Sequence, residues 1–329
     1  MGSRHGNGLG VLGFRTHRNR VRQRHMVPRL LYIALQAAGF TTLARRIRNA
    51  GVVLCYHNVE VPSGAAEAGA SGLHMPVDRF RNEMRWLVAH YDVLPLSGFL
   101  DRVASGESMH QTASVTFDDA YAGVFEHAWP VLRDLGIPAT VFVITGAPGR
   151  NRLFWWDRAA PQRASNDRRR HQWLTTLRGD GEAILRSLPA VTEGAEATAA
   201  ARLPADWEVI AQAARSGVEL GVHSATHRAL PALGDDELVD EIETSRTTLS
   251  RETGTRPSFF AFPYGLWDER VRSCVQHAGY RAAFTLDYGL VRAGMDPWAL
   301  PRVNVPAGIR DPAYQAWAAG LSLRHALGR

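Results

Sequence analysis

From residue 51 onward, short apolar runs alternate with segments whose apolar residues recur at helical spacing. The apolar runs predict strands over residues 51–56, 114–117, 139–144, 218–222, 258–262, 282–286 and 302–305. The periodic segments predict helices over residues 76–91, 121–135, 235–252 and 268–277. This alternation indicates an α/β fold with a parallel sheet and outer helices, and the number of repeats is more typical of a barrel than of an open sheet.

Residues 148–206 interrupt the alternation, and we interpret them as a helical insertion over one rim of the barrel. We expect a single domain, with the barrel over residues 50–310 and a C-terminal helix over residues 311–329. A chain of 329 residues can bury a core that needs no disulfide or metal for its stability. The two cysteines, Cys55 and Cys274, are interpreted as buried thiols.

The basic charge of the chain is concentrated at its N-terminus. Residues 1–50 contain ten arginines and no acidic residue, whereas the rest of the chain carries 28 arginines against 32 acidic residues. Residues 1–27 are rich in Gly, Arg and His without apolar periodicity, so we expect a disordered basic arm. A basic arm on a slightly acidic body is a poor electrostatic match for nucleic acid, and no nucleic-acid partner is expected.

The pattern over residues 28–49 predicts an amphipathic helix with three open interpretations. Its apolar stretch is too short to span a bilayer, and a secretory signal has little support without a clear cleavage site, although a start at Met26 would strengthen it. The helix could lie on an anionic membrane surface, or pack against the domain, which is the simplest interpretation. We expect a cytoplasmic protein, with peripheral membrane contact through the arm as an option and export less favoured.

Residues with metal chemistry stand where two of the predicted strands end. Asp118 and Asp119 follow the second strand, and His223 and His227 follow the fourth. One carboxylate (Asp119) and the two imidazoles could hold a divalent cation and leave positions open for water and substrate, the pattern of a catalytic site. Zinc is the expected metal, with Co, Ni, Fe or Mn as alternatives. For the histidine pair taken alone, two surface side chains are the competing interpretation.

Other strand ends offer the remaining groups that a hydrolysis needs. A cation would neutralise Asp119 and leave Asp118 as the base that takes a proton from the attacking water. A helix N-cap would explain one of these aspartates but not the pair. The backbone amide of Tyr264, in a turn after a strand, is a candidate oxyanion donor, and His57, at the end of the first strand, is the candidate acid for the leaving group.

Three motifs, in this order and spacing, resemble the NodB-homology polysaccharide deacetylases, carbohydrate esterase family four. They are Thr116-Phe117-Asp118-Asp119, His223-Ser224-x-x-His227 and Phe262-Pro263-Tyr264-Gly265, and the resemblance covers residues 50–306. It implies a distorted (β/α)7 barrel that uses a metal to remove acetyl groups from sugars, usually N-acetyl hexosamines. By position, the resemblance implies that Asp118 is the base, that the Tyr264 amide is the oxyanion donor and that the three residues named above are the metal ligands.

The chain departs from that family's pattern in three places. Ala120 stands where a glycine is usual, the arginine that opens the third motif in many members is missing, and so is the late Leu-x-x-His motif. The last two departures resemble the poly-N-acetylglucosamine deacetylases, whose barrel is circularly permuted and whose acid histidine comes early, where His57 stands. We hypothesise that Arg302 replaces the missing arginine by pairing with Asp118.

The predicted function is therefore removal of acetyl groups from an N-acetylated carbohydrate, either a polysaccharide or a glycan precursor. A carbohydrate O-acetyl esterase would share the same catalytic groups, and a non-catalytic sugar-binding module is disfavoured by the complete set. Trp155, Trp156 and Trp267 are candidates for stacking on sugar rings, with core packing as the competing role. Asp287 is a candidate secondary site residue, and the sequence does not predict the oligomeric state.

Overall fold

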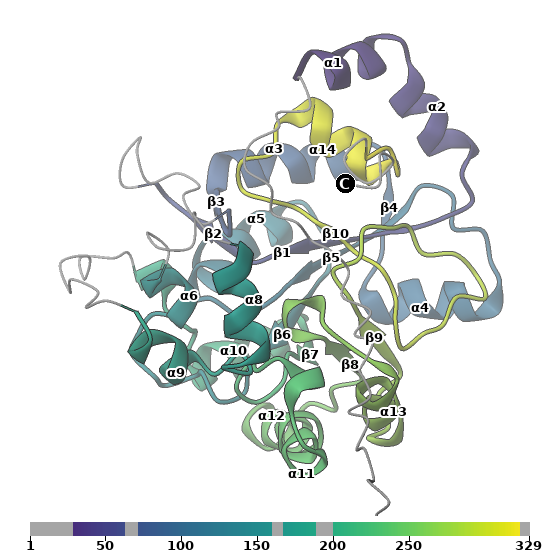
Figure 1. Cartoon of the computed structure of the whole chain (residues 1–329). Coiled ribbons are helices and arrows are strands. Elements are labelled where there is room, and N and C mark those ends of the chain that lie inside the picture. Colours follow the sequence, from purple (N-terminus) through teal and green to yellow (C-terminus); the bar gives the residue numbers. More distant parts are fainter. Residues whose placement is uncertain (1–28, 63–71, 160–166, 189–199, 323–329) are drawn as a thin grey trace, which may run out of the picture.

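A computed structural model describes residues 29–62, 72–159, 167–188 and 200–322 (Figure 1). Its main sheet confirms the seven predicted strands, which are β1 (Val52–Tyr56), β5 (Thr112–Phe117), β6 (Ala139–Val143), β7 (Glu219–Val222), β8 (Phe259–Ala261), β9 (Ala282–Phe284) and β10 (Val303–Asn304). The strands are parallel and follow the order β10-β1-β5-β6-β7-β8-β9. A parallel bridge between Phe284 of β9 and Leu300, in the segment that leads into β10, brings the two ends of this path together, so the sheet is a distorted seven-stranded barrel.

Three short strands escaped the sequence pattern: β2 (Asn58–Glu60), β3 (His74–Pro76) and β4 (Asp92–Val93). The strands β2 and β3 form a small parallel sheet of their own, and β4 pairs with β5 beside the barrel path. Their sequences, Asn-Val-Glu, His-Met-Pro and Asp-Val, contain polar residues or proline, so no continuous apolar run marks these strands.

Both faces of the barrel strands are buried, which explains why the strands are apolar without alternation. In β1, Val53 belongs to a cluster with Phe142 of β6 and Phe284 of β9, which fills the inside of the barrel. Its neighbours Leu54 and Tyr56 point the other way and join the large core between the sheet and the helices. The odd-numbered positions of β1, which include Cys55, therefore face the interior that leads to the candidate site.

The helices surround the barrel (Figure 1). Their bounds are α3 (Val77–Val88), α4 (Leu96–Ser105), η1 (Val124–Ala128), α5 (Trp129–Asp134), α10 (Trp207–Arg215), η3 (Leu230–Ala232), α11 (Asp235–Val239), η4 (Asp240–Thr244), α12 (Ser245–Thr253), η5 (Pro263–Gly265) and α13 (Glu269–His277). All four predicted helices are present, and two of them contain a π-helical turn, η1 and η4. The helices α4 and α10 were not predicted.

The two ends of the chain correct the sequence prediction. The single helix expected over residues 28–49 is wrong, because Gly39 adopts a left-handed backbone (φ 76°) that separates α1 (Arg29–Ala37) from α2 (Phe40–Ile47). The C-terminal helix expected over residues 311–329 ends much earlier: α14 is Asp311–Ala318, and Gly320 has a φ of 77°. The predicted disordered arm, residues 1–27, lies outside the described residues.

Of the helical hairpin α1–α2, the helix α1 packs on α14 at the outside of the molecule, and α2 lies beside it (Figure 1). The indole of Trp317 donates a hydrogen bond to the hydroxyl of Tyr32 over 2.8 Å, and Gln36 donates to Gln315 over 2.6 Å. This contact agrees with the simplest interpretation of the segment, that it packs on the domain. Within the described ranges, every helix is too short or too polar to cross a membrane.

The described part of the insertion is helical. It contains α6 (Trp155–Arg158), α8 (Asp167–Thr175), α9 (Gly181–Arg186) and η2 (Ala200–Arg202). Trp173, Ile184 and Leu188 form a small core of their own with Ala159. The insertion is therefore a packed unit attached to the barrel, and α6 carries Trp156 toward the strand ends.

Candidate active site

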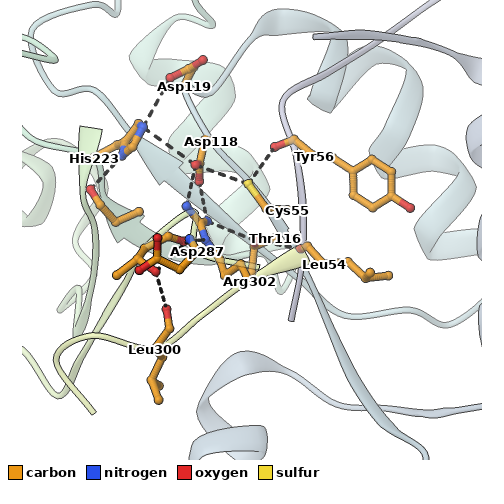
Figure 2. A network of polar contacts seen from close by, with 12 residues as sticks. Leu54, Cys55, Tyr56, Thr116, Asp118, Asp119, His223, Asp287, Leu300 and Arg302 are labelled. Atoms are coloured by element: carbon orange, nitrogen blue, oxygen red, sulfur yellow. Dashed lines mark hydrogen bonds and ion pairs between the residues drawn. The ribbon is translucent and has the colours of Figure 1, made fainter. Parts of the chain in front are cut away.

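Four parallel strands deliver the candidate side chains to one end of the barrel. Asp118 and Asp119 follow β5, His223 follows β7, His57 follows β1, and Tyr264 lies three residues beyond the end of β8. Because the carboxyl ends of parallel strands meet at one edge, side chains far apart in the sequence become neighbours. Figure 2 shows His223 between Asp118 and Asp119, with Arg302 paired to Asp118.

The three predicted metal ligands are buried and face one another. Asp119 Oδ1 lies 3.5 Å from His223 Nε2 and 3.6 Å from His227 Nε2, and the two Nε2 atoms are 3.2 Å apart. A tetrahedral ion with ligand bonds of about 2.0–2.1 Å needs ligand atoms about 3.3 Å apart. The separations of this triad therefore fit a divalent metal of that size.

The two imidazoles are in a suitable state for ligation. Burial lowers the pKa of both His223 and His227, which keeps the rings neutral. His223 Nδ1 donates to the carbonyl of Ala261 over 2.8 Å, so its Nε2 lone pair faces Asp119 and His227. Protonation of one nitrogen leaves the other free to bind a cation.

A tight loop places His227 opposite His223. Ser224 and His227 both have left-handed backbones, with φ of 66° and 60°, and the amide of His227 donates to Ser224 Oγ over 2.9 Å. Buried Glu241, from the π-turn η4, accepts the amide hydrogens of Ala225 at 3.0 Å and Thr226 at 2.9 Å, and the hydroxyl of Thr226 as well. Glu241 belongs to no sequence motif. It meets the loop only because the π-helical segment η4 packs beside that loop in the folded protein.

Unusual backbone conformations gather at the site. Asp119 (φ 72°), Ala120 (φ 54°) and Tyr264 (φ 59°) lie in the left-handed region that glycine adopts easily. This explains why a glycine is usual at position 120 in the family that the sequence resembles, and the alanine here adds a strain of about 1 kcal/mol. Such strain persists only where the surrounding packing holds it.

The paired carboxylate and guanidinium of Asp118 and Arg302 occupy the barrel interior (Figure 2). Arg302 Nη1 and Nη2 donate to the two carboxylate oxygens of Asp118, each over 2.7 Å. Arg302 Nε donates to the carbonyl of Thr285 over 3.0 Å, and the guanidinium lies 5.4 Å from the ring centroid of Phe142. Burial alone would raise the pKa of Asp118, but the charge and hydrogen bonds of Arg302 and the nearby His223 hold it below its ordinary value.

Cys55 and His57 complete the surroundings of Asp118. Cys55 Sγ lies 3.4 Å from Asp118 Oδ2, and burial raises the pKa of the thiol well above its ordinary value, so the thiol is the donor. A ring nitrogen of His57, Cys55 Sγ and an oxygen of Asp118 all lie within 4.8 Å of one another. Burial lowers the pKa of His57 to about 4, so its ring is neutral at neutral pH. The prediction of a buried thiol is confirmed for Cys55, whereas Cys274 is only half-buried.

A buried polar chain supports the other side of His227. The ring of Trp156 packs on His227, with centroids 4.6 Å apart, and its indole donates to the hydroxyl of Tyr121 over 2.6 Å. Tyr121 in turn donates to Asp157 over 2.8 Å, and Asp157 pairs with His74 at 3.0 Å. Trp156 is a sequence candidate for sugar stacking, but nothing in the sequence indicates the roles of Tyr121, Asp157 and His74, because no fixed spacing relates α6 to β3.

The remaining candidates have mixed surroundings. Trp156 is buried, Trp155 packs edge-on against Trp173, and Trp267 stacks on Phe262, so each has an aromatic neighbour in the protein. Trp155 and Trp156 also line a pocket of about 450 Å³ beside His227, where sugar stacking stays a prediction. The backbone carbonyl of Asp287 accepts the amide hydrogen of Arg302 over 3.0 Å, so Asp287 contacts the site through its main chain.

The chain is similar to known proteins in its family pattern, its sequence and its fold. A family model described as "Polysaccharide deacetylase" matches residues 105–283, more than half of the chain. A poly-beta-1,6-N-acetyl-D-glucosamine N-deacetylase of Staphylococcus aureus (strain MSSA476) is 19% identical over 240 residues, which cover 73% of this chain and 70% of the relative.

Two solved structures share the fold. The deacetylase PplD of Streptococcus pyogenes, in complex with acetate, superposes with a TM-score of 0.59 at 18% identity, over 82% of this chain and 98% of that chain. IcaB from Ammonifex degensii also gives a TM-score of 0.59, at 22% identity, over 83% of this chain and 98% of that one. At these identities the likeness supports the barrel architecture and no more.

We predict that the variant Glu241→Gln binds zinc about 10- to 100-fold more weakly than the native chain, because its amide cannot accept all three hydrogen bonds that hold the ligand loop. Competition with a chromogenic chelator would measure the affinity. The matched control is Glu243→Gln, on the exposed side of the same π-turn. Equal zinc affinity of the two variants would contradict the role of Glu241.

Proposed function

Because the chain belongs to the polysaccharide deacetylase family, we propose that it is a metal-dependent N-deacetylase acting on an N-acetylated carbohydrate. The observation that carries the proposal is the buried triad of Asp119, His223 and His227 beside a carboxylate that Arg302 keeps ionised. An amide substrate is supported by the name of the Staphylococcus aureus relative, an N-deacetylase. Zinc is the proposed metal, since an open set of two histidines and one aspartate suits it.

In the proposed mechanism the triad would hold the cation, which when bound supplies a Lewis acid for the acetyl carbonyl and the attacking water. Asp118 accepts a proton from that water. Its low pKa makes it a weak base but ensures that it is ionised when substrate arrives, and Arg302 holds both oxygens in a fixed orientation. The backbone amide of Tyr264 donates to the oxygen that becomes negative as the carbonyl is attacked.

His57 has the complementary task of protonating the leaving amine. Its neutral ring must first gain a proton, and Asp118, within 4.8 Å of it, has one to give after the attack on the carbonyl. The proton that leaves the water thus ends on the amine, and acetate is the other product.

The proposed function predicts that zinc-loaded protein releases acetate from N-acetylglucosamine oligomers. Asp118→Asn should lower kcat by about 10²–10⁴-fold, the contribution typical of a general base, while its zinc content is unchanged. Enzymatic acetate detection and metal analysis of both proteins would measure this. Acetate release from acetylated xylan alone would overturn the amide assignment, and zinc binding without turnover on either substrate would favour a non-catalytic sugar-binding protein.

A second prediction concerns Arg302. Arg302→Lys keeps the positive charge but cannot form two parallel hydrogen bonds, so we expect kcat to fall about 10- to 100-fold with zinc retained. The matched control is Arg246→Lys, because Arg246 also packs on an aromatic ring and donates to backbone carbonyls, far from the site. Full activity of Arg302→Lys would remove the orienting role.

The proposed role of His57 predicts a dependence on the leaving group. His57→Gln should lower kcat on N-acetylglucosamine oligomers about 100-fold, but reduce hydrolysis of 4-nitrophenyl acetate less than about tenfold, since nitrophenolate leaves without protonation. Steady-state rates on both substrates would test this. An equal loss on the two substrates would show that His57 is not the acid.

A further inference from the structure

The α1–α2 hairpin exposes apolar side chains to an extent not seen elsewhere in the described residues. Ten large apolar side chains are exposed in that part of the chain, and six of them belong to this hairpin: Leu30, Leu31, Ile33, Phe40, Leu43 and Ile47. Leu30 is 75% exposed, Ile47 65% and Phe40 55%. The other four are valines on separate segments, so the six form the one concentration of large exposed apolar residues in the described chain, and we call them the outer face.

The opposite side of the hairpin is fixed to the body of the protein. Tyr32, Thr41 and Ala44 are buried, Tyr32 accepts the hydrogen bond from Trp317, and Arg48 donates to the carbonyl of Gly320 over 2.7 Å. The hairpin therefore has one side that packs on the domain and an opposite side that is exposed. Within the described part of the chain, this outer face has no partner. An exposed apolar helix face on a soluble body marks a docking surface.

The charge of the N-terminal sequence favours one kind of partner. The first 50 residues carry ten arginines and no acidic residue; six of these arginines precede α1, and Arg46 is exposed on α2 next to Ile47. A second copy of the chain would bring a like-charged segment against this face, which disfavours self-association. A partner with an apolar interior and a negatively charged boundary would match both the exposed apolar side chains and the excess of arginines.

We propose that the outer face docks on an anionic phospholipid bilayer, with Phe40, Leu43 and Ile47 entering the headgroup boundary and arginines contacting lipid phosphates. The helices have 9 and 8 residues, which suits a hairpin lying in the interface rather than crossing the bilayer. Figure 1 shows α1 above α14 and α2 beside it, both at the edge of the molecule. This proposal does not depend on the proposed deacetylase activity, because docking involves no turnover.

The test is flotation of the full chain with vesicles of phosphatidylcholine and phosphatidylglycerol at about 3:1, against pure phosphatidylcholine. Binding to the anionic vesicles should weaken at least about tenfold in pure phosphatidylcholine or in about 0.5 M NaCl, because the attraction to lipid phosphates is screened. The triple variant Phe40→Ser, Leu43→Ser, Ile47→Ser should lose at least about tenfold in partition coefficient. The control Val88→Ser, Val209→Ser, Val239→Ser removes exposed valines elsewhere and should bind as the native chain does.

Circular dichroism and zinc content of each variant would show that its fold is intact. Light scattering of the native chain and the triple variant distinguishes the competing occupant. A native dimer that the triple variant converts to a monomer, with no vesicle binding, would overturn the proposal in favour of a second copy of the chain. Vesicle binding that is equal for both triple variants, or indifferent to lipid charge, would overturn it as well.

Discussion

The buried pair of Arg302 and Asp118 is the interaction on which the site and the closure of the barrel both depend. Arg302 lies just before β10, immediately after the bridge that joins the two ends of the sheet, and it is fully buried. A guanidinium without a partner there would be very costly, since a buried charge left unpaired costs about 3–5 kcal/mol. The two parallel hydrogen bonds to Asp118, with the carbonyl of Thr285, satisfy most of its donors. These hydrogen bonds stabilise the buried guanidinium, and they also keep the carboxylate of Asp118 ionised.

Around this pair the fold combines strain with support. Left-handed backbones at Asp119, Ala120 and His227 aim side chains at one point, at a cost in local stability. The hydrogen bonds of Glu241, the carbonyl of Ala261 and the packing of Trp156 hold that arrangement. The supporting groups come from a π-turn, a strand end and the insertion, so the whole molecule, rather than the local motifs, makes the triad rigid.

The insertion and the N-terminal hairpin adapt a common barrel in different ways. The insertion places Trp156 and Asp157 behind His227, and its aromatic residues border the pocket at the site. The hairpin leaves the barrel core unchanged and adds an apolar outer face next to a strongly basic segment. A glycan hydrolase held at a lipid surface would meet substrates that are attached to or made at that surface, which links the two proposals without making either depend on the other.

The sequence by itself determined the barrel strands and the grouping of the metal-type residues at their ends. Continuous apolar runs can only be buried on both faces, and parallel strands share a carboxyl edge, so Asp118, Asp119 and His223 had to meet. The motif resemblance strengthened the prediction for His57, already a candidate from its place at a strand end, and added the hypothesis of an arginine partner. The tertiary structure alone decided the bidentate geometry of Arg302, the loop contacts of Glu241 and the chain from Trp156 to His74, because these contacts join segments with no fixed spacing. The tertiary structure also showed that the N-terminal helix breaks at Gly39 and that its apolar residues are exposed. A glycine permits a positive φ but does not require one, so the sequence alone could not predict this break.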